Sequence, residues 1–359
     1  MVRASNLGID SRTQRIIRLF LSLGWAVRVI CWDRTPSNLA FEGGEDVEIV
    51  SFRRIAPHGR HFRNLISLFL WQIFVLRKTL LRKGELQYGC DLESYFPLVL
   101  NKFLLRNMLL FDQFDPFSTK MKNPILKRVI DHVEKRAASF ADATIVPSIE
   151  RQAFFPFGTK IIENIPDSNW PRTPNLNEEN ILVYIGTLQS DRFLEEAMNA
   201  VELEQSWTFW LAGQGPLSDQ IASRSKLNKR IVFLGEIPHH NVPEIAGKSS
   251  LMLATYDPSL LNNRLTASNK LGEAAILGLP IIATRGTKLG EQVAKFNMGF
   301  VVNPGNSFEI IKILRSFREV SAQTDFQKNA DTYLLKHSWQ AQASIFADIL
   351  RQLGLLHES

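Results

Sequence analysis

Residues 268–284 read SNKLGEAAILGLPIIAT, and this pattern predicts a short helix that leads into a buried strand. Ser268 and Asn269 are residue types that cap the N-terminus of a helix. The Gly-Leu-Pro turn at Gly278 ends the helix, and the apolar run after it is typical of a strand. A helix that feeds directly into a buried strand belongs to a βαβ unit. The stretch therefore indicates an α/β fold with a parallel sheet.

The rest of the C-terminal half repeats this alternation. Segments of helical period such as RFLEEAMNAVEL, residues 192–203, separate short apolar runs bounded by Gly or polar residues. Continuous apolar strands are expected where helices cover both faces of a sheet. The predicted strands of this half begin at Ile181, Trp207, Arg230, Ser250, Pro280 and Gly299.

The N-terminal half shows the same pattern less regularly. Its first helix is predicted over SRTQRIIRLFLSLG and ends at Gly24. A doubly wound sheet normally opens with a full strand, but only MVRAS precedes this helix. The first strand is therefore expected to be stunted, or the sequence to begin inside it. The other predicted strands begin at Ala26, Asp46, Leu86, Asn107, Asp142 and Lys160.

The stretch IPDSNWPRTPNLNEEN, residues 165–180, holds three prolines and no periodicity, which is typical of a domain linker. We therefore predict two Rossmann-like, doubly wound α/β domains that face a central cleft, with ligands at the carboxyl ends of the strands. The N-terminal domain is assigned to residues 1–165, the linker to 166–180 and the C-terminal domain to 181–335. A last helix, in 336–359, is expected to pack back toward the N-terminal domain.

Composition gives the expected compartment and partners. The two cysteines lack metal-ligand spacing and fit a reducing compartment, and MVRASNLGID has no apolar signal segment, so a cytoplasmic protein is expected. Residues 1–172 hold 25 Lys and Arg against 17 Asp and Glu, so this half is expected to meet an anionic partner. No nucleic-acid motif accompanies the basic residues, so nucleic acid is not the expected partner.

Residues 53–84 concentrate this charge, with eight Arg and Lys and no acid around the apolar stretch LISLFLWQIFVL. That stretch is too short to span a bilayer, which takes about 20 residues. It is either a buried crossover helix with basic ends or a surface element that rests on anionic lipid headgroups. A half-buried helix would satisfy both interpretations, with peripheral contact at the inner face of a membrane.

Several common sites are missing from the sequence. The chain has no P-loop, and AGQGP at Ala212 lacks the third glycine of a dinucleotide fingerprint, which argues against NAD. It has no HExxH, no Cys/His ligand spacing and no Asp-x-Asp pair. No cofactor and no metal are therefore expected.

The helix that begins near Ser268 is the best candidate for a ligand site. Its free backbone N–H groups and positive dipole end suit a diphosphate, and Lys270 adds a point charge. Glu273 lies one turn on and can accept hydrogen bonds from the two vicinal hydroxyls of a ribose. The alternative is a surface Lys-Glu pair on an ordinary packing helix.

Four stretches in this order resemble the donor domain of retaining GT-B glycosyltransferases of the family-four type: YIGTLQSDRFLEEAMNA, WLAGQGPL, IVFLGEIPHHNVPEI and SNKLGEAAILGLPIIAT. In the N-terminal half, DSRTQRIIRLFLSLGWAVRVI, DLESYFPLVL and IIENIPD agree. The resemblance implies transfer of a sugar from a UDP- or GDP-linked donor, with retention of configuration and without a metal. Implied acceptors are saccharides or lipid-diphosphate-linked saccharides, as in bacterial surface-polysaccharide assembly.

The resemblance also implies roles for residues of the donor domain. Glu273 matches the glutamate that binds the nucleotide ribose, and Arg192 stands where the family has a diphosphate-binding lysine. Lys270 and Arg192 would stabilise the leaving diphosphate. The remaining donor-binding positions implied are Gly186, Thr187, Gly213, Gly215, Arg264, Thr266, Ala267, Ser268 and Asn269.

Three positions depart from the family pattern. Leu265 replaces a second glutamate, Thr187 replaces an arginine and Phe114 stands where a histidine is common. Asn263 and Arg264 adjoin Leu265 and could cover part of the lost role, or Arg264 could be a plain surface residue. The departures leave a second interpretation open, in which the chain is a catalytically silent GT-B homologue that binds nucleotide or a partner.

On the acceptor side, Asp112 and Asp115 are the nearest candidates for contact with the acceptor, and the departing phosphate oxygen can itself take the acceptor proton. Asp10, Arg12 and Asp91 are expected at the cleft edge of the same domain. Each has an alternative: Asp10 and Asp115 could be helix N-caps, and Arg12 a solvated residue of a first turn.

Overall fold

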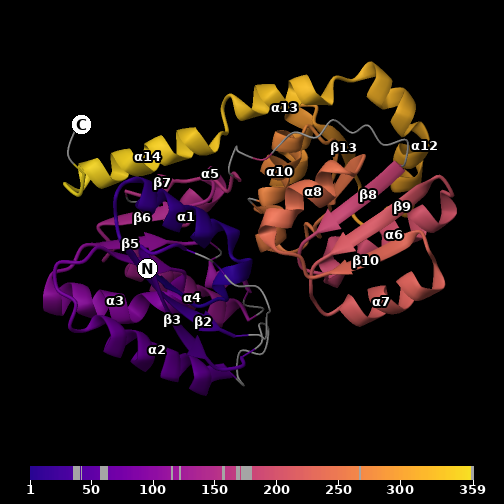
Figure 1. Cartoon of the computed structure of the whole chain (residues 1–359). Coiled ribbons are helices and arrows are strands. Elements are labelled where there is room, and N and C mark those ends of the chain that lie inside the picture. Colours follow the sequence, from indigo (N-terminus) through magenta and orange to yellow (C-terminus); the bar gives the residue numbers. More distant parts are fainter. Residues whose placement is uncertain are drawn as a thin grey trace. The chain divides into compact units, whose positions relative to one another are not determined.

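The computed structural model describes residues 1–34, 41, 43–56, 64–114, 116–120, 123–155, 158–166, 170, 180–266 and 268–356. The chain folds into two compact units: unit 1 comprises Met1–Glu163 with Gln342–Ser359, and unit 2 comprises Asn164–Ala341. Each unit has its own parallel sheet between layers of helices (Figure 1). The predicted fold of two doubly wound α/β domains is confirmed. Most of the expected linker, 166–180, lies outside the described residues.

Unit 2 is built on a six-stranded sheet in the order β10-β9-β8-β11-β12-β13. The chain enters at the central strand β8, winds outward to β10, and then crosses back to β11. Such a reversal creates a crevice outside the carboxyl ends of the two central strands, where doubly wound sheets bind ligands. The strands are β8 (Asn180–Ile185), β9 (Trp207–Ala212), β10 (Ile231–Gly235), β11 (Leu251–Ala254), β12 (Ile281–Thr284) and β13 (Gly299–Val302).

Alternate residues of these strands enter two separate cores. Leu182 and Tyr184 pack on one face of the sheet and Val183 on the other, as the period of two of a strand requires. The first face carries α6 (Leu194–Leu203), α7 (Ser218–Leu227) and α12 (Ser307–Gln323). The second carries α8 (Val242–Gly247), α10 (Asn269–Leu277), α11 (Lys288–Lys295) and α13 (Phe326–Leu334). Short helical turns are η4 (Ser190–Arg192), η5 (His239–Asn241) and α9 (Leu261–Arg264).

Unit 1 has a seven-stranded sheet in the order β3-β2-β1-β4-β5-β6-β7. Its interior strand β1 is the short strand expected in MVRAS: Val2 pairs with Ile30 on one side and Gly89 on the other. The strands are β1 (Val2–Arg3), β2 (Val27–Asp33), β3 (Val47–Arg53), β4 (Gln87–Cys90), β5 (Leu109–Asp112), β6 (Ala143–Val146) and β7 (Lys160–Ile161).

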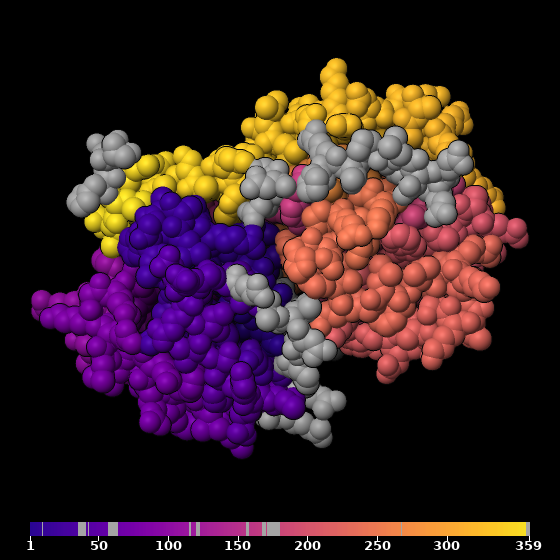
Figure 2. Space-filling model, in the orientation of Figure 1, coloured from indigo at the N-terminus to yellow at the C-terminus, as the bar shows by residue number. Residues whose placement is uncertain are grey.

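One face of this sheet packs against α2 (Leu65–Thr79), α3 (Leu92–Leu105) and α4 (Pro124–Ala138). The other carries α1 (Ser11–Ser22) and the end of α14 (Trp339–Gln352), where the Phe20 ring lies 5.2 Å from that of Phe346. In Figure 2 the yellow C-terminal segment lies against the indigo N-terminal residues of unit 1. No helix among the described residues is both long and apolar enough to cross a membrane. The remaining helical turns are η1 (Leu7–Ile9), η3 (Phe117–Lys120) and α5 (Ile149–Gln152).

Candidate functional site

Helix α10 begins as the sequence predicts. Ser268 has extended backbone angles, and its hydroxyl accepts a hydrogen bond from the Lys270 N–H at 3.2 Å. Gly278 ends the helix in the left-handed conformation, with φ +70°. Every residue of the helix from Lys270 to its end is buried, so its capped N-terminus lies inside unit 2, at the carboxyl end of the sheet.

Lys270 extends from this turn between two tyrosines. Its Nζ atom lies 4.8 Å from the ring centroid of Tyr184 and 3.3 Å from the Oη atom of Tyr256. The Tyr256 hydroxyl also lies 2.9 Å from that of Ser268. The ammonium is thus held by π-faces and a phenol oxygen, with no described carboxylate within ion-pair distance of it. A buried cation in such surroundings attracts a ligand phosphate strongly.

Arg192 approaches the same tyrosine. Its guanidinium carbon lies 4.5 Å from the Tyr256 ring centroid, while its Nη1 donates to Asp191 at 2.6 Å and to Asn263 at 3.1 Å. The Asn263 amide also donates to Asp191 at 2.7 Å. Arg192 is therefore oriented by neighbours on both sides, and Asn263 reaches it from the segment next to Leu265.

The two cations act on the acidity of Tyr256. Burial raises the pKa of this phenol, but Lys270, Arg192 and the hydrogen bond from Ser268 outweigh burial, so the pKa of Tyr256 lies below its usual value of 10.0. Sequence reasoning missed Tyr256, because a tyrosine after the strand β11 carries no motif. The one available signal in the sequence was its position two residues after the strand β11, which borders the crevice.

Glu273 is buried one turn further along α10. Its Oε1 atom lies 3.6 Å from Nε2 of His239, and the His239 ring lies 5.4 Å from that of Trp170. This group lies in unit 2 beside the N-terminal turn of α10. A carboxylate and an imidazole this close can both form hydrogen bonds to the hydroxyl groups of a ligand. His239 and Trp170 were not predicted.

Two predicted glycines allow backbone segments to approach closely. A Cβ atom on Gly213 would lie 1.9 Å from the Gly186 carbonyl oxygen, and one on Gly215 would lie 2.2 Å from that of Leu188. A Cβ on Gly186 would come within 2.9 Å of Lys270 Nζ. Only glycine fits there, so the turns after β8 and β9 bring bare backbone next to the lysine.

The remaining predicted donor positions are less informative. Thr187 accepts a hydrogen bond from the Tyr184 hydroxyl at 2.8 Å through its carbonyl. Arg264 ends α9, and Thr266 lies two residues beyond it. Asn269 is the first residue of α10, and Ala267 lies outside the described residues.

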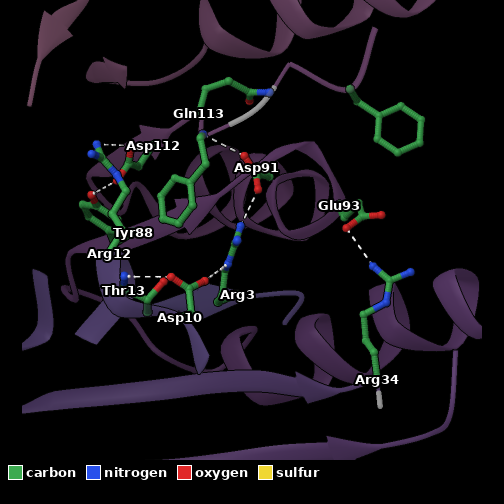
Figure 3. A network of polar contacts seen from close by, with 12 residues as sticks. Arg3, Asp10, Arg12, Thr13, Arg34, Tyr88, Asp91, Glu93, Asp112 and Gln113 are labelled. Carbon is green, nitrogen blue, oxygen red and sulfur yellow. Dashed lines mark hydrogen bonds and ion pairs between the residues drawn. The ribbon is translucent and has the colours of Figure 1, made fainter. Parts of the chain in front are cut away.

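A second polar cluster lies at the carboxyl edge of the unit 1 sheet (Figure 3). Arg3 ends β1, Asp91 follows β4 and Asp112 ends β5, and these neighbouring parallel strands bring them together. Arg3 forms ion pairs with Asp10, at 2.5 Å, and with Asp91. Asp10 also caps α1 by accepting from the Thr13 N–H at 3.0 Å. Arg3 was not predicted, because MVRAS indicates a strand and carries no motif.

Arg12 and Asp112 form the buried half of this cluster. The Arg12 guanidinium donates from Nε at 3.1 Å and from Nη2 at 2.8 Å to the two oxygens of Asp112, and from Nη1 to the Ile162 carbonyl at 2.7 Å. The Tyr88 hydroxyl donates to Asp112 at 2.5 Å. Burial, followed by the charge of Asp112, raises the pKa of Tyr88 well above its usual value, so this hydroxyl stays a donor.

Asp91 has an unusual backbone. Its φ of +56° and ψ of 164° are costly for a residue with a side chain. Its carboxylate accepts from the Phe114 N–H at 2.8 Å, and the Phe114 ring lies 4.2 Å from the Arg3 and 5.0 Å from the Arg12 guanidinium carbon. Phe114 thus gives both arginines an aromatic surface where the family pattern has a histidine. The adjacent Asp115 lies outside the described residues.

Glu134 of α4 fixes the start of the next loop. Its buried carboxylate accepts from the Ser118 N–H at 3.0 Å, from the Phe117 N–H at 2.5 Å and from the Gln113 amide at 3.0 Å. Burial raises the pKa of Glu134, and the two amide hydrogen bonds oppose this without cancelling it. Over the described residues, no group of three or more His, Cys, Asp or Glu side chains is placed to hold a metal ion.

Residues 179–317 match the family model of the glycosyl transferases group 1. No curated protein sequence matches the chain.

Solved structures resemble the whole chain. Sucrose-phosphate synthase from Thermosynechococcus elongatus superposes with a TM-score of 0.75 at 17% identity over 98% of both chains. Anabaena HepE in complex with UDP and glucose gives 0.71 at 17% identity over 99% of both. WaaG, a glycosyltransferase involved in lipopolysaccharide biosynthesis, gives 0.62 at 16% identity over 97% of this chain and 99% of that one. The whole chain thus shares the two-domain fold of these solved structures, and its residues 179–317 match the glycosyl transferases group 1 model.

Proposed function

We propose that the protein transfers a sugar from a nucleoside-diphosphate sugar to a saccharide or lipid-linked saccharide, with retention of configuration and without a metal ion or cofactor. The observation that carries the proposal is the convergence of Lys270, Arg192 and the capped N-terminus of α10 on Tyr256. Two cations and a helix end in one small volume suit two phosphate groups. Glu273, one turn away, suits a ribose.

These groups support the following mechanism. Negative charge develops on the diphosphate as the glycosidic bond to the donor sugar breaks, and Lys270 and Arg192 stabilise that charge in surroundings of low dielectric. The acceptor oxygen bonds to the anomeric carbon on the face that the diphosphate leaves, and the departing phosphate oxygen takes the acceptor proton. No side-chain base is needed for that step, so Phe114 in place of a histidine is compatible with activity. Anabaena HepE, which shares the fold, binds UDP, and this favours a UDP-sugar over a GDP-sugar.

The acceptor is assigned to unit 1, at the cluster of Arg3, Asp10 and Asp91. These groups lie at the carboxyl edge of its sheet, and their side chains keep 8–17% of their surface exposed. Asp112 is fully buried, so its proposed role is to orient Arg12. A basic unit suits an acceptor carried on a lipid diphosphate at the inner face of a membrane, with peripheral contact through residues 53–84. The involvement of WaaG in lipopolysaccharide biosynthesis supports an acceptor of this class.

The second candidate is a catalytically silent homologue that binds nucleotide. Leu265 and Phe114 favour it, because both replace polar residues of the family pattern. Both candidates predict nucleotide binding. Only the enzyme releases the nucleoside diphosphate from its sugar conjugate, by transfer or by slow hydrolysis.

A thermal-shift panel of UDP, GDP, ADP, CMP and their sugar conjugates tests the donor site. One nucleoside diphosphate should raise the melting temperature of the wild type and not that of Glu273→Ala. The matched control is Glu244→Ala, which removes an exposed carboxylate of the same unit and should leave the shift intact. No shift with any nucleotide at millimolar concentration would refute both candidates, and a shift without turnover would favour the silent homologue.

A further inference from the structure

Helices α2 and α3 of unit 1 present a shared apolar surface to solvent. The two helices pack side by side (Figure 1), since Gln72 Nε2 of α2 donates to the Glu93 carbonyl of α3 at 2.6 Å and Asn101 of α3 donates to Thr79 of α2 at 2.5 Å. We call the exposed side the α2–α3 face. Its exposed large apolar side chains are Leu65, Ile66, Phe69 and Ile73 from α2, with Phe96, Leu100, Phe103 and Leu104 from α3.

The pattern on each helix shows that this exposure is systematic. Helix α2 buries Ser67, Trp71, Val75 and Thr79 at a spacing of four, so its exposed apolar residues fall on the opposite side of the helix. Helix α3 exposes apolar residues at positions 96, 100, 103 and 104, which is the spacing of one helical stripe. Apolar stripes on two neighbouring helices mark an interaction site rather than scattered surface residues.

Four cations lie beside the face. Arg77 and Lys78 lie in the last turn of α2, Lys83 follows that helix, and Arg106 caps the end of α3. Within the part of the chain that the structure describes, no ion pair joins these four side chains to an acid.

The nearby acids are already engaged by other cations. Glu93 pairs with Arg34 at 3.0 Å, and Asp142 pairs with Lys102 at 2.5 Å. The α2–α3 face therefore combines apolar stripes with unneutralised positive charge at their ends.

We propose that the α2–α3 face docks on the surface of a bilayer that contains anionic lipids. Phe69 and Phe103 would enter the boundary between headgroups and acyl chains, while Arg77, Lys83 and Arg106 would contact the headgroups. A second copy of the chain is the alternative occupant, and the sedimentation-velocity measurement below tests it.

This inference deepens the acceptor side of the proposed function and rests on it, since a lipid-linked acceptor would be met at that surface. The sequence pointed only to residues 53–84, and thus to α2. Helix α3 doubles the apolar surface and lies outside that range. Its N-cap is Asp91, so the docking helix and the proposed acceptor cluster share one element.

Sedimentation of the full chain with vesicles tests the inference, in the absence of nucleotide. Vesicles of phosphatidylglycerol and phosphatidylcholine should bind the wild type, and vesicles of phosphatidylcholine alone should bind it far more weakly. The double variant Phe69→Ser/Phe103→Ser should bind the mixed vesicles about tenfold more weakly or worse. The matched control is Phe308→Ser in unit 2, whose ring is 75% exposed, against 65% and 63% for the other two; it should bind as the wild type does.

The contribution of the positive charges is tested with the double variant Arg77→Ala/Lys83→Ala. This variant should bind mixed vesicles about tenfold more weakly or worse, and its binding should depend less on salt. Equal binding by wild type and both double variants would overturn the proposal. A second outcome would also overturn it: the wild type is a dimer in sedimentation velocity, Phe69→Ser/Phe103→Ser is a monomer, and neither protein binds vesicles. The nucleotide shift, measured on the same variants without lipid, reports on the donor site separately, so failure of one proposal is distinguishable from failure of the other.

Discussion

The Nζ atom of Lys270 lies 3.3 Å from the Oη atom of Tyr256, and both side chains are buried in unit 2. Because Arg192 also contacts the Tyr256 ring, two cations converge on one aromatic side chain. Their mutual repulsion is offset by the electron-rich ring and the phenol oxygen. Arg192 already pairs with Asp191 at 2.6 Å, whereas Lys270 forms no ion pair with a described carboxylate, so an incoming phosphate would chiefly neutralise Lys270.

Tyr256 should ionise at lower pH than Tyr88, Tyr95 and Tyr184. Burial raises the pKa of Tyr88, Tyr95 and Tyr184, whereas the two cations lower that of Tyr256. Tyrosinate absorbance should therefore show a component that titrates below pH 10.0. It should be absent in Tyr256→Phe and move upward in Lys270→Met.

The lowered pKa of Tyr256 also determines how the stability of the folded state changes with pH. An acid whose pKa is lower in the folded state stabilises that state increasingly as pH rises through the folded value. The free energy of unfolding of wild type relative to Tyr256→Phe should therefore increase in that range. A difference that stays constant with pH would show that the cations do not act on this phenol.

Gly213→Ala should be among the most destabilising single substitutions in unit 2. The new Cβ would lie 1.9 Å from the Gly186 carbonyl oxygen, and the φ of +135° is itself strained for alanine. We expect a loss of more than about 3 kcal/mol in urea unfolding. Gly235→Ala is the control, because its φ is +68° but no atom lies within 4 Å of its Cβ, and it should cost about 1 kcal/mol. Equal losses of stability in the two variants would mean that the turn after β9 can move away from the Gly186 carbonyl.

The sequence predicted the fold well because both halves alternate apolar strands with helices of regular period. It also predicted α10 with its N-cap Ser268, since capping chemistry is local. Arg3 and Tyr256 were missed for the opposite reason: their roles depend on partners brought close only by the sheet. Arg3 reaches Asp91, 88 positions away, and no local pattern encodes such a contact.

Arg12→Ala should destabilise unit 1 strongly. The substitution removes both hydrogen bonds from Arg12 to Asp112, whose side chain is fully buried, and an unpaired buried carboxylate costs about 3–5 kcal/mol. The control is Arg28→Ala, which breaks the ion pair to the largely exposed Glu48 and should cost less than about 1 kcal/mol. Urea unfolding measures both. A small loss in Arg12→Ala would indicate that Tyr88 alone, or a new donor, satisfies Asp112.

Glu134→Gln should change the pH dependence of stability in a defined direction. Burial raises the pKa of the Glu134 carboxyl above its usual 4.5, more than its hydrogen bonds lower it. A group whose pKa is raised on folding stabilises the folded state below its unfolded pKa, and that contribution is lost as pH rises through the folded value.

The free energy of unfolding of wild type relative to Glu134→Gln should therefore decline as pH rises above 4.5. Urea unfolding of both proteins across acidic and neutral pH measures this difference. Glu48→Gln serves as the control of opposite sign, because the hydrogen bond from Arg28 lowers the pKa of the Glu48 carboxyl. If the wild type instead gains stability relative to Glu134→Gln with rising pH, the amide donors from Phe117 and Ser118 dominate over burial. The loop after β5 would then be held by a permanently charged carboxylate.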